Sequence, residues 1–478
     1  MLAGYYHVLF NSYEFLIFFP LVALLFWLLP QRAKTPWLLV ASCVFYGWLI
    51  PVYLTIMAVI IVVDYCVGLQ MVKMESPRAR RWFLGISLAS NVGLLAVFKY
   101  YNFANGNLTA LADWMGWQNR LPFLEMALPI GLSFHTFQAM SYIFEVYKKR
   151  CPVERNFLRY ALYVMFFPQM VAGPIERPQN VLPQLRHWLP FDQGRVVSGL
   201  RRIMWGLVKK VLIADRLALC ADTIFNHPGE QHGLVVLIGV YAFALQIYCD
   251  FSGYSDIAVG TARVLGVRLM ENFRRPYFAV DLREFWQRWH ISLSTWFRDY
   301  LYIPLGGNRG GAWKVYRNLL IVFVISGLWH GAAWTFIIWG ALHGLGVIFS
   351  TAWRNRFPAA VSFIGRWPGI LLTFHFVAVT WIFFRTQTLA DAGRIFASLG
   401  QWKSMPWPLP GLDLPETLVA IALTLILLFG DALAERRPDS DLMTKWPSGV
   451  RWAVYLLTGL AMIFLSPYSG KAFIYFQF

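Results

Sequence analysis

The stretch SGLWHGAAWTFIIWGALHG, residues 326–344, places two histidines in a run of apolar and small residues. A run of about 20 such residues is long enough to cross a bilayer. An ionisable side chain there is costly and tends to mark a functional site. Burial keeps the imidazole of His330 neutral and able to accept a proton, as a general base must. A packed histidine bonded to a backbone carbonyl is the alternative interpretation.

The rest of the chain has the composition of a membrane protein. Of its 478 residues, 58% are hydrophobic and only 14% are charged, against about 25% charged residues in soluble domains. No polar stretch is long enough for a separate soluble domain. The sequence therefore predicts an all-α polytopic fold in one membrane domain, 1–478. Its core lies at about 120–350, and peripheral helices occupy 1–110 and 367–478.

Apolar windows of about 20 residues predict the membrane-spanning segments. The first should be a retained span, since neither a basic region before it nor a cleavage site after it marks a signal peptide. Several windows are too short or too polar to cross as straight helices. Two segments, residues 128–147 and 166–185, contain interrupting prolines or glycines, and broken segments persist at membrane depth only inside protein or beside a wet cavity. The windows are 13–30, 37–50, 52–72, 82–102, 127–147, 157–175, 196–224, 233–252, 254–270, 315–331, 333–352, 368–385, 414–434 and 450–467.

The net charge of +17 is concentrated in short loops between apolar runs, such as residues 73–81 and 148–159. Cytoplasmic loops of membrane proteins carry such an excess of lysine and arginine. We therefore expect these loops to face the cytoplasm and anionic headgroups, with no nucleic-acid partner. The five cysteines lack the spacing of a zinc site or of a disulfide framework.

Residues 263–317 differ from the rest because arginines and aromatic residues alternate there without a spanning run. Trp286, Trp289, Leu293 and Trp296 recur at helical spacing. This pattern favours a pair of helices that dip into the cytoplasmic leaflet, with aromatic rings at headgroup level, over a cytosolic helix.

Further polar residues fall in and around this segment. His290 precedes His330, but no additional ligands converge in sequence, so we expect no metal site. On one continuous helix His343 and His330 would point to different sides, which favours a packing role for His343. His135 is assigned the same role.

Two carboxylates, Asp250 and Asp256, lie in the apolar stretch QIYCDFSGYSDIAVG, residues 246–260. Buried carboxylates need partners, and the arginines of the following segment are the expected ones. A structural ion pair and a direct catalytic role both remain open.

Three strings together resemble the membrane-bound O-acyltransferase family: YCDFSGYSDIAVG, NFRRPYFAVDLREFWQRWHISLSTWFRDYLYIPLGGNR and GLWHGAAWTFIIWGALHG. The resemblance extends over nearly the whole chain and is strongest to the bacterial branch that includes the alginate O-acetylation membrane subunit. It implies a ring of helices and re-entrant segments around a central funnel or tunnel. It also implies that His330 is catalytic and that His290 lies on the cytoplasmic approach of the acyl donor.

The resemblance implies the following activity. An acyl group, expected to be acetyl, would pass from a cytoplasmic thioester such as acetyl-CoA across the bacterial inner membrane to an extracytoplasmic polysaccharide. Alginate comes first among the acceptors, followed by another exopolysaccharide such as cellulose and by peptidoglycan. A separate periplasmic or membrane-anchored esterase-like partner would complete the transfer, with no bound cofactor.

Roles for the remaining candidates follow from this activity. Arg288, Arg298 and Trp289 would bind the donor, because guanidinium groups pair with phosphates. Asp250 and Asp256 would support the site. The alternative function is a transporter or flippase that uses intramembrane histidines and aspartates without covalent chemistry. The absence of a visible internal repeat weakens this alternative.

Overall fold

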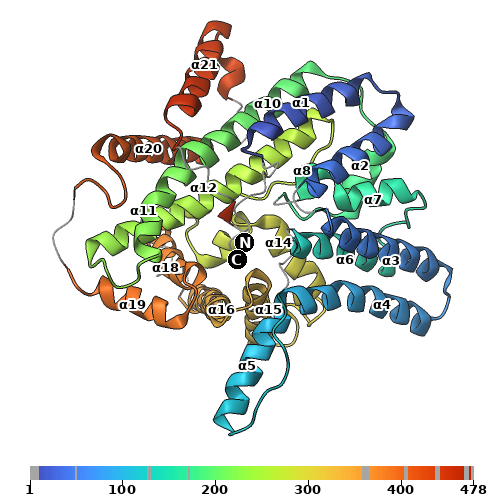
Figure 1. The fold of residues 1–478 in the computed structure, drawn as a ribbon, viewed down its shortest axis with the longest axis horizontal. Helices are drawn as coiled ribbons and strands as arrows, with labels where there is room; N and C mark the ends of the chain where they lie inside the picture. Colours follow the sequence, from blue (N-terminus) through green and yellow to red (C-terminus); the bar gives the residue numbers. More distant parts are fainter. Residues whose placement is uncertain are drawn as a thin grey trace. The chain divides into compact units, whose positions relative to one another are not determined.

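The computed structural model describes residues 10–48, 51–125, 129, 131–170, 173–357, 365–402, 407–436, 442–467 and 473–474. Helices dominate these ranges, and the described residues contain no strand, which confirms the predicted all-helical fold (Figure 1). The chain forms two compact units. One comprises residues 1–203 and 256–271, and the other comprises residues 204–255 and 272–478.

The first unit holds the N-terminal helices and the end of α12. Its elements are α1 (Tyr13–Leu28), α2 (Gln31–Gly47), α3 (Tyr53–Lys73), α4 (Pro77–Leu95), the π-helix η1 (Ala96–Tyr100), α5 (Tyr101–Trp114), α6 (Leu132–Tyr147), α7 (Phe157–Met165), α8 (Phe167–Met170), α9 (Pro178–Arg186) and most of α10 (Gln193–Leu207).

The second unit holds most of α12 and both histidines of interest. Its elements are η2 (Val208–Ala214), α11 (Asp215–Phe225), α12 (Leu234–Val264), η3 (Pro276–Phe278), α13 (Leu282–Arg288), α14 (Ile291–Phe297), η4 (Arg298–Tyr302), α15 (Ala312–His330), α16 (Trp334–Arg356), α18 (Arg366–Arg385), α19 (Leu389–Leu399), α20 (Leu414–Arg436), η5 (Leu442–Lys445) and α21 (Ser448–Phe464).

Six of the described helices are long and apolar enough to cross a membrane, which confirms a multi-pass membrane protein. They are Tyr53–Lys73, Pro77–Trp114, Leu234–Val264, Trp334–Arg356, Arg366–Arg385 and Leu414–Arg436. The windows predicted at 233–252 and 254–270 were wrongly separated. They form one helix of 31 residues, since no proline interrupts it.

Prolines and glycines break the helices in the middle of the chain, as the sequence predicted. The window at 157–175 resolves into α7 with nine residues and α8 with four, and α9 has nine. Such helices are far shorter than the about 20 residues needed to cross a bilayer. Within the described part of the window at 127–147, helix α6 begins at Leu132, directly after Gly131 in the left-handed conformation.

Residues 263–317, where arginines and aromatic residues alternate, also contain a pair of helices, but the two helices do not form one continuous helix. Helix α13 ends at Arg288 and α14 begins at Ile291, and His290 between them has a left-handed backbone with φ of 44°. Trp286, Trp289, Leu293 and Trp296 are all buried. The predicted pair is present, with a turn at the histidine. The expected position of its aromatic rings at headgroup level is wrong, because these rings pack inside the protein.

The opening stretch forms a hairpin of two helices. Helix α15 ends at His330, residues 331–333 leave the helical conformation, and α16 begins at Trp334. The comparison of His330 with His343 assumed that both lie on one continuous helix, and this assumption is wrong. The two helices touch closely because Gly327 and Gly340 face each other. A Cβ atom built on either glycine would lie 3.2 Å from the Cα atom of the other.

Candidate functional site

His330 is the last residue of α15 and is 5% exposed. The ring centroids of Trp329, Trp339 and Phe384 lie 4.9, 5.1 and 5.3 Å from that of His330. Gly331 follows, and a Cβ atom at that position would lie 2.0 Å from the ring of Phe336. The missing side chain at Gly331 thus lets the chain turn beside a tightly enclosed imidazole.

His290 is completely buried in the same unit. Its ring meets the ring of Phe251 edge to face at 4.7 Å and lies 6.2 Å from that of Trp329. Trp329 therefore lies against both His290 and His330. The structure brings together the two histidines that the sequence singled out, through one shared tryptophan.

Hydrogen bonds define the protonation of the His290 ring. Its Nδ1 atom lies 3.1 Å from the Oδ1 atom of Asn272. The same oxygen accepts hydrogen bonds from the hydroxyl and the backbone N–H of Ser292, at 2.9 and 3.3 Å. An amide oxygen can only accept, so Nδ1 of His290 carries the proton and Nε2 carries the lone pair.

His343 in α16 has both ring nitrogens bound within the protein. The indole N–H of Trp286 donates to Nδ1 at 3.3 Å, and Nε2 lies 2.9 Å from the hydroxyl oxygen of Thr380. Because an indole N–H only donates, Nε2 of His343 is the protonated nitrogen. This arrangement anchors α16 to α13 and α18, in line with a packing role.

The rings form an alternating series within the second unit. His290, Trp329, His330, Trp339 and His343 follow one another, with centroid separations of 6.2, 4.9, 5.1 and 4.8 Å. Aromatic and imidazole rings exclude water from such a cluster. A proton acceptor there acts in a medium where electrostatic interactions are strong.

The predicted donor-binding residues occupy different environments. Arg288 donates to Glu284 at 2.6 Å and to Glu435 at 3.0 Å, and so already has two carboxylate partners. Arg298 is exposed and pairs with the adjacent Asp299 at 2.8 Å. Trp289 is buried and stacks on Phe285. Of the three, only Arg298 presents a largely exposed charge.

The partners expected for Asp250 were wrong. Asp250 pairs with Lys210 at 2.9 Å, and Lys210 also pairs with Asp215 at 2.8 Å. The backbone N–H of Ile474 donates to Oδ2 of Asp250 at 2.7 Å. These partners come from the preceding segment η2 and from the far end of the chain, and none comes from the arginines that follow Asp250.

Asp256 belongs to the other compact unit. It accepts from Arg202 at 2.9 Å, and Arg202 also pairs with Glu271. Arg202 precedes Asp256 in the chain, and Arg263, one of the arginines that follow it, also interacts with it electrostatically. Both carboxylates thus lie in structural ion pairs.

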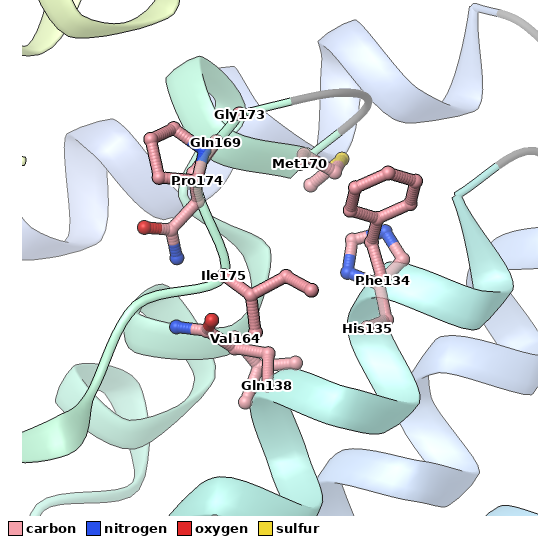
Figure 2. A pocket seen from close by; sticks show the side chains of 9 residues that line it. All are labelled: Phe134, His135, Gln138, Val164, Gln169, Met170, Gly173, Pro174 and Ile175. Carbon is pink, nitrogen blue, oxygen red and sulfur yellow. The ribbon is translucent and has the colours of Figure 1, made fainter. Parts of the chain in front are cut away.

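The first unit contains a small cavity beside His135 (Figure 2). Its volume is about 10 Å³, which is at the lower limit for one water molecule. Gln138 from α6 and Gln169 from α8 line it together with apolar side chains. The ring of Tyr46 packs against the imidazole at 5.6 Å. These contacts are those of a packed histidine.

Several residues of the histidine cluster and its surroundings were not predicted from the sequence. Asn272 orients His290, Glu435 receives several arginines, and Lys210 neutralises Asp250. In the sequence, such residues can be noticed only as polar residues near apolar stretches. That position does not reveal which residue each one contacts. Within the described ranges, no three metal-ligating side chains gather as they would in a metal site.

Comparison with known proteins gives a consistent result. The model of the membrane-bound O-acyltransferase family matches residues 132–389. This range contains α6 to α18 and both His290 and His330.

Individual relatives cover most of the chain. It is 37% identical to the "probable alginate O-acetylase" of Azotobacter vinelandii, over 98% of this chain and 100% of that protein. It is 35% identical to a peptidoglycan O-acetyltransferase of Helicobacter pylori, over 82% of this chain and 80% of that protein. A teichoic acid D-alanyltransferase of Bacillus subtilis is 30% identical over 52% of this chain and 66% of that protein.

Proposed function

Since the chain belongs to the membrane-bound O-acyltransferase family, and is therefore an O-acyltransferase, we propose that it transfers acetyl groups to an extracytoplasmic polysaccharide. The donor is a cytoplasmic thioester, acetyl-CoA in the simplest case, and the chain lies in a bacterial inner membrane. The observation that carries the proposal is that the rings of His290 and His330 both lie against Trp329, inside one cluster of aromatic rings. Family membership sets aside the transporter interpretation.

His330 is the general base in this proposal. Its imidazole removes the proton from an acceptor hydroxyl, either on the polysaccharide or on a relay group of a partner. The oxygen attacks the thioester carbonyl, the carbon–sulfur bond breaks, and the thiolate takes the proton from the imidazolium. Base catalysis of this kind contributes about 10²–10⁴-fold. The products are an ester and a free thiol, and the imidazole is neutral again. No atom changes its oxidation state, so the step needs no redox cofactor.

His290 has a positioning role or binds the thioester directly. Because Asn272 holds its Nδ1–H, the ring presents Nε2 as an acceptor. The exposed Arg298 is the candidate for pairing with donor phosphates, whereas Arg288 is bound by Glu284 and Glu435. Trp289 is buried, so its role in this proposal is to stabilise the packing of the segment along which the donor approaches.

The names of the relatives guide the choice of acceptor. Alginate comes first, because the relatives that match over nearly their full length are called alginate O-acetylases. Peptidoglycan follows, on the name of the Helicobacter protein, and cellulose comes last. A separate esterase-like partner outside the membrane would deliver the group to the polymer.

The test uses purified full-length protein, radiolabelled acetyl-CoA and a periplasmic extract, with alginate, peptidoglycan or cellulose fragments as acceptors. His330→Gln should lower label transfer by at least about a hundredfold. His343→Gln is the matched control, since His343 packs against the same Trp339 and should keep most of the transfer. Equal transfer by wild type and His330→Gln, with both proteins folded, would remove His330 as the base.

A further inference from the structure

A wide apolar groove lies between α16 and α18 in the second unit. Its volume is about 760 Å³, within the range of about 300–1,000 Å³ that is typical of ligand sites. Phe349 and Leu372 line it and are 67% and 66% exposed. Phe376 also lines it and packs against the ring of His343 at 5.7 Å.

The groove opens between two helices that each cross a membrane by length and composition. In a bilayer, an exposed apolar surface at this depth meets hydrocarbon instead of water. The occupant therefore needs an apolar portion that is long and flexible enough to fill the slot. An acyl chain has this shape.

Arginines stand at one end of the groove. Arg354 lies in the last turn of α16 and Arg366 opens α18, so both mark the end of a spanning helix. Both line the groove, and their side chains are 48% and 56% exposed. Trp353 and Trp367 lie beside them and are also exposed, as is usual for tryptophans at the membrane–water interface.

The charges at this end are only partly balanced. Arg354 pairs with Asp281, and Arg366 pairs with Glu435 at 3.0 Å. Glu435 is shared, because Arg275 and Arg288 also pair with it at 3.1 and 3.0 Å. Three guanidinium groups thus share one carboxylate. A guanidinium has five N–H donors, so Arg366 and Arg354 retain donors for a second anion.

We propose that this groove binds an anionic glycerophospholipid from the bilayer. The phosphate lies between Arg354 and Arg366, where charge-assisted hydrogen bonds are strong. One acyl chain follows the apolar wall formed by Phe349, Leu372 and Phe376. The lipid would join α16 to α18 next to the hairpin that carries His330, and this inference does not depend on the proposed acyl transfer.

Native mass spectrometry of the delipidated full-length protein in detergent tests the proposal. The added probes are dioleoylphosphatidylglycerol, dioleoylphosphatidylcholine and glycerol 3-phosphate. We expect phosphatidylglycerol to bind about tenfold more tightly than phosphatidylcholine. Both lipids carry one phosphate, but the choline ammonium of phosphatidylcholine is repelled by the two arginines. Glycerol 3-phosphate alone should bind more weakly than either lipid, because it lacks the chains.

The double variant Arg354→Gln/Arg366→Gln should lose the preference for phosphatidylglycerol. Arg394→Gln is the matched control, because Arg394 is also an exposed arginine in an ion pair, with Asp391 at 2.8 Å, and does not line the groove. An unchanged preference in the double variant would overturn the proposal, as would an equal loss in the control.

A further substitution tests whether the acyl chain lies in the groove, and it leaves the ion pairs of the arginines intact. Ser350→Trp places a large ring in the groove, whereas Leu345→Trp places one on the exposed side of the same helix. Ser350→Trp should weaken both lipids at least about tenfold, and Leu345→Trp should not. The proposal fails if Ser350→Trp binds lipid normally, or if palmitoyl-CoA displaces phosphatidylglycerol at equal concentration.

Discussion

Nδ1 of His290 lies 3.1 Å from Oδ1 of Asn272, an oxygen that Ser292 also uses as its acceptor. The ring of His290 is thereby held in one orientation and one tautomer. His343, in the same unit, has the opposite tautomer, because Trp286 donates to its Nδ1. Two buried histidines thus differ in the nitrogen that can accept a proton.

The first prediction concerns this orientation. Asn272→Leu removes the acceptor, so the His290 ring can rotate, and misplacement of about 1 Å can cost about a hundredfold in rate. We expect the turnover rate to fall by about that factor. An unchanged KM for the thioester would indicate a positioning role for His290, and a raised KM would indicate that His290 binds the thioester. Acetyl transfer over a range of donor concentrations separates the two quantities.

The matched variant is Ser292→Ala, which leaves the contact between His290 and Asn272 in place and should lose less activity. Asn272→Asp retains an acceptor at the same position and should recover part of the turnover. A turnover rate in Asn272→Leu equal to that of wild type would show that the orientation of His290 has no effect on catalysis.

A second prediction concerns the buried charges around Lys210. Its ammonium group pairs with Asp250 and with Asp215, and all three side chains are buried. Removing one member of a buried ion pair costs about 3–5 kcal/mol, since the remaining charge is left uncompensated. Lys210→Met leaves two buried carboxylates without their cation, so it should lower the thermal midpoint more than Asp250→Asn does.

The combined variant Lys210→Met/Asp250→Asn leaves a single carboxylate and should be more stable than Lys210→Met alone. Thermal unfolding of the purified proteins in one detergent provides the comparison. If the combined variant is less stable by the sum of the two single effects, the two side chains do not interact as described.

A third prediction concerns the contact between α15 and α16. A Cβ atom at Gly340 would lie 2.3 Å from the backbone oxygen of Phe323, and a helix backbone cannot move aside as a side chain can. Small residues at such contacts let membrane helices approach closely. Gly340→Ala should therefore push α15 away and lower both stability, by about 1–3 kcal/mol, and transfer.

Gly430→Ala is the control, because Gly430 lies within α20 and nothing stands within 4 Å of an added Cβ atom. It should be neutral or stabilising, by up to about 1 kcal/mol, since alanine favours the helix. If the thermal midpoints of both variants fall equally, the close contact at Gly340 does not explain the loss of stability.

The sequence predicted the parts of this structure that depend on local composition. Apolar windows predicted each of the six described helices that are long and apolar enough to span a membrane, but they also marked segments such as 157–175 and 315–331 that are not among those six. The prolines and glycines around Pro168 and Gly173 predicted the broken segment. Arginine and tryptophan spacing gave the pair α13 and α14. One boundary between predicted spans was wrong. Gly253 separates two predicted windows but lies inside the continuous helix α12.

Long-range partners could not be predicted in this way. Asn272 meets His290 only because the chain turns between α12 and α13, and Glu435 reaches Arg288 across 147 positions. Lys210 precedes Asp250 and was overlooked in favour of nearer arginines. Each pairing depends on how helices pack, and a single sequence contains no direct record of packing.

The last prediction concerns Glu176, which lies between α8 and α9, outside the spanning helices. Burial raises the pKa of Glu176 to about 7 from an ordinary value of 4.5, even though Asn180 and the N–H of Met270 donate to its carboxylate. A raised pKa means that the folded protein holds this proton more tightly than the unfolded chain. Its stabilising contribution is complete below pH 4.5 and is lost as the pH rises to about 7.

We therefore expect Glu176 to lower the free energy of unfolding of the wild type, relative to a variant without this carboxyl group, by up to about 3 kcal/mol as the pH rises from 4.5 to 7. Glu176→Gln imitates the protonated side chain, so the excess of its thermal midpoint over that of wild type should grow between pH 4.5 and 7 and be largest at pH above 7. Glu75→Gln removes an exposed carboxylate instead and should leave the slope of the wild type unchanged. If Glu176→Gln keeps that slope too, the buried carboxylate is ionised in the folded protein throughout this range, and the hydrogen bonds from Asn180 and Met270 outweigh the cost of its burial.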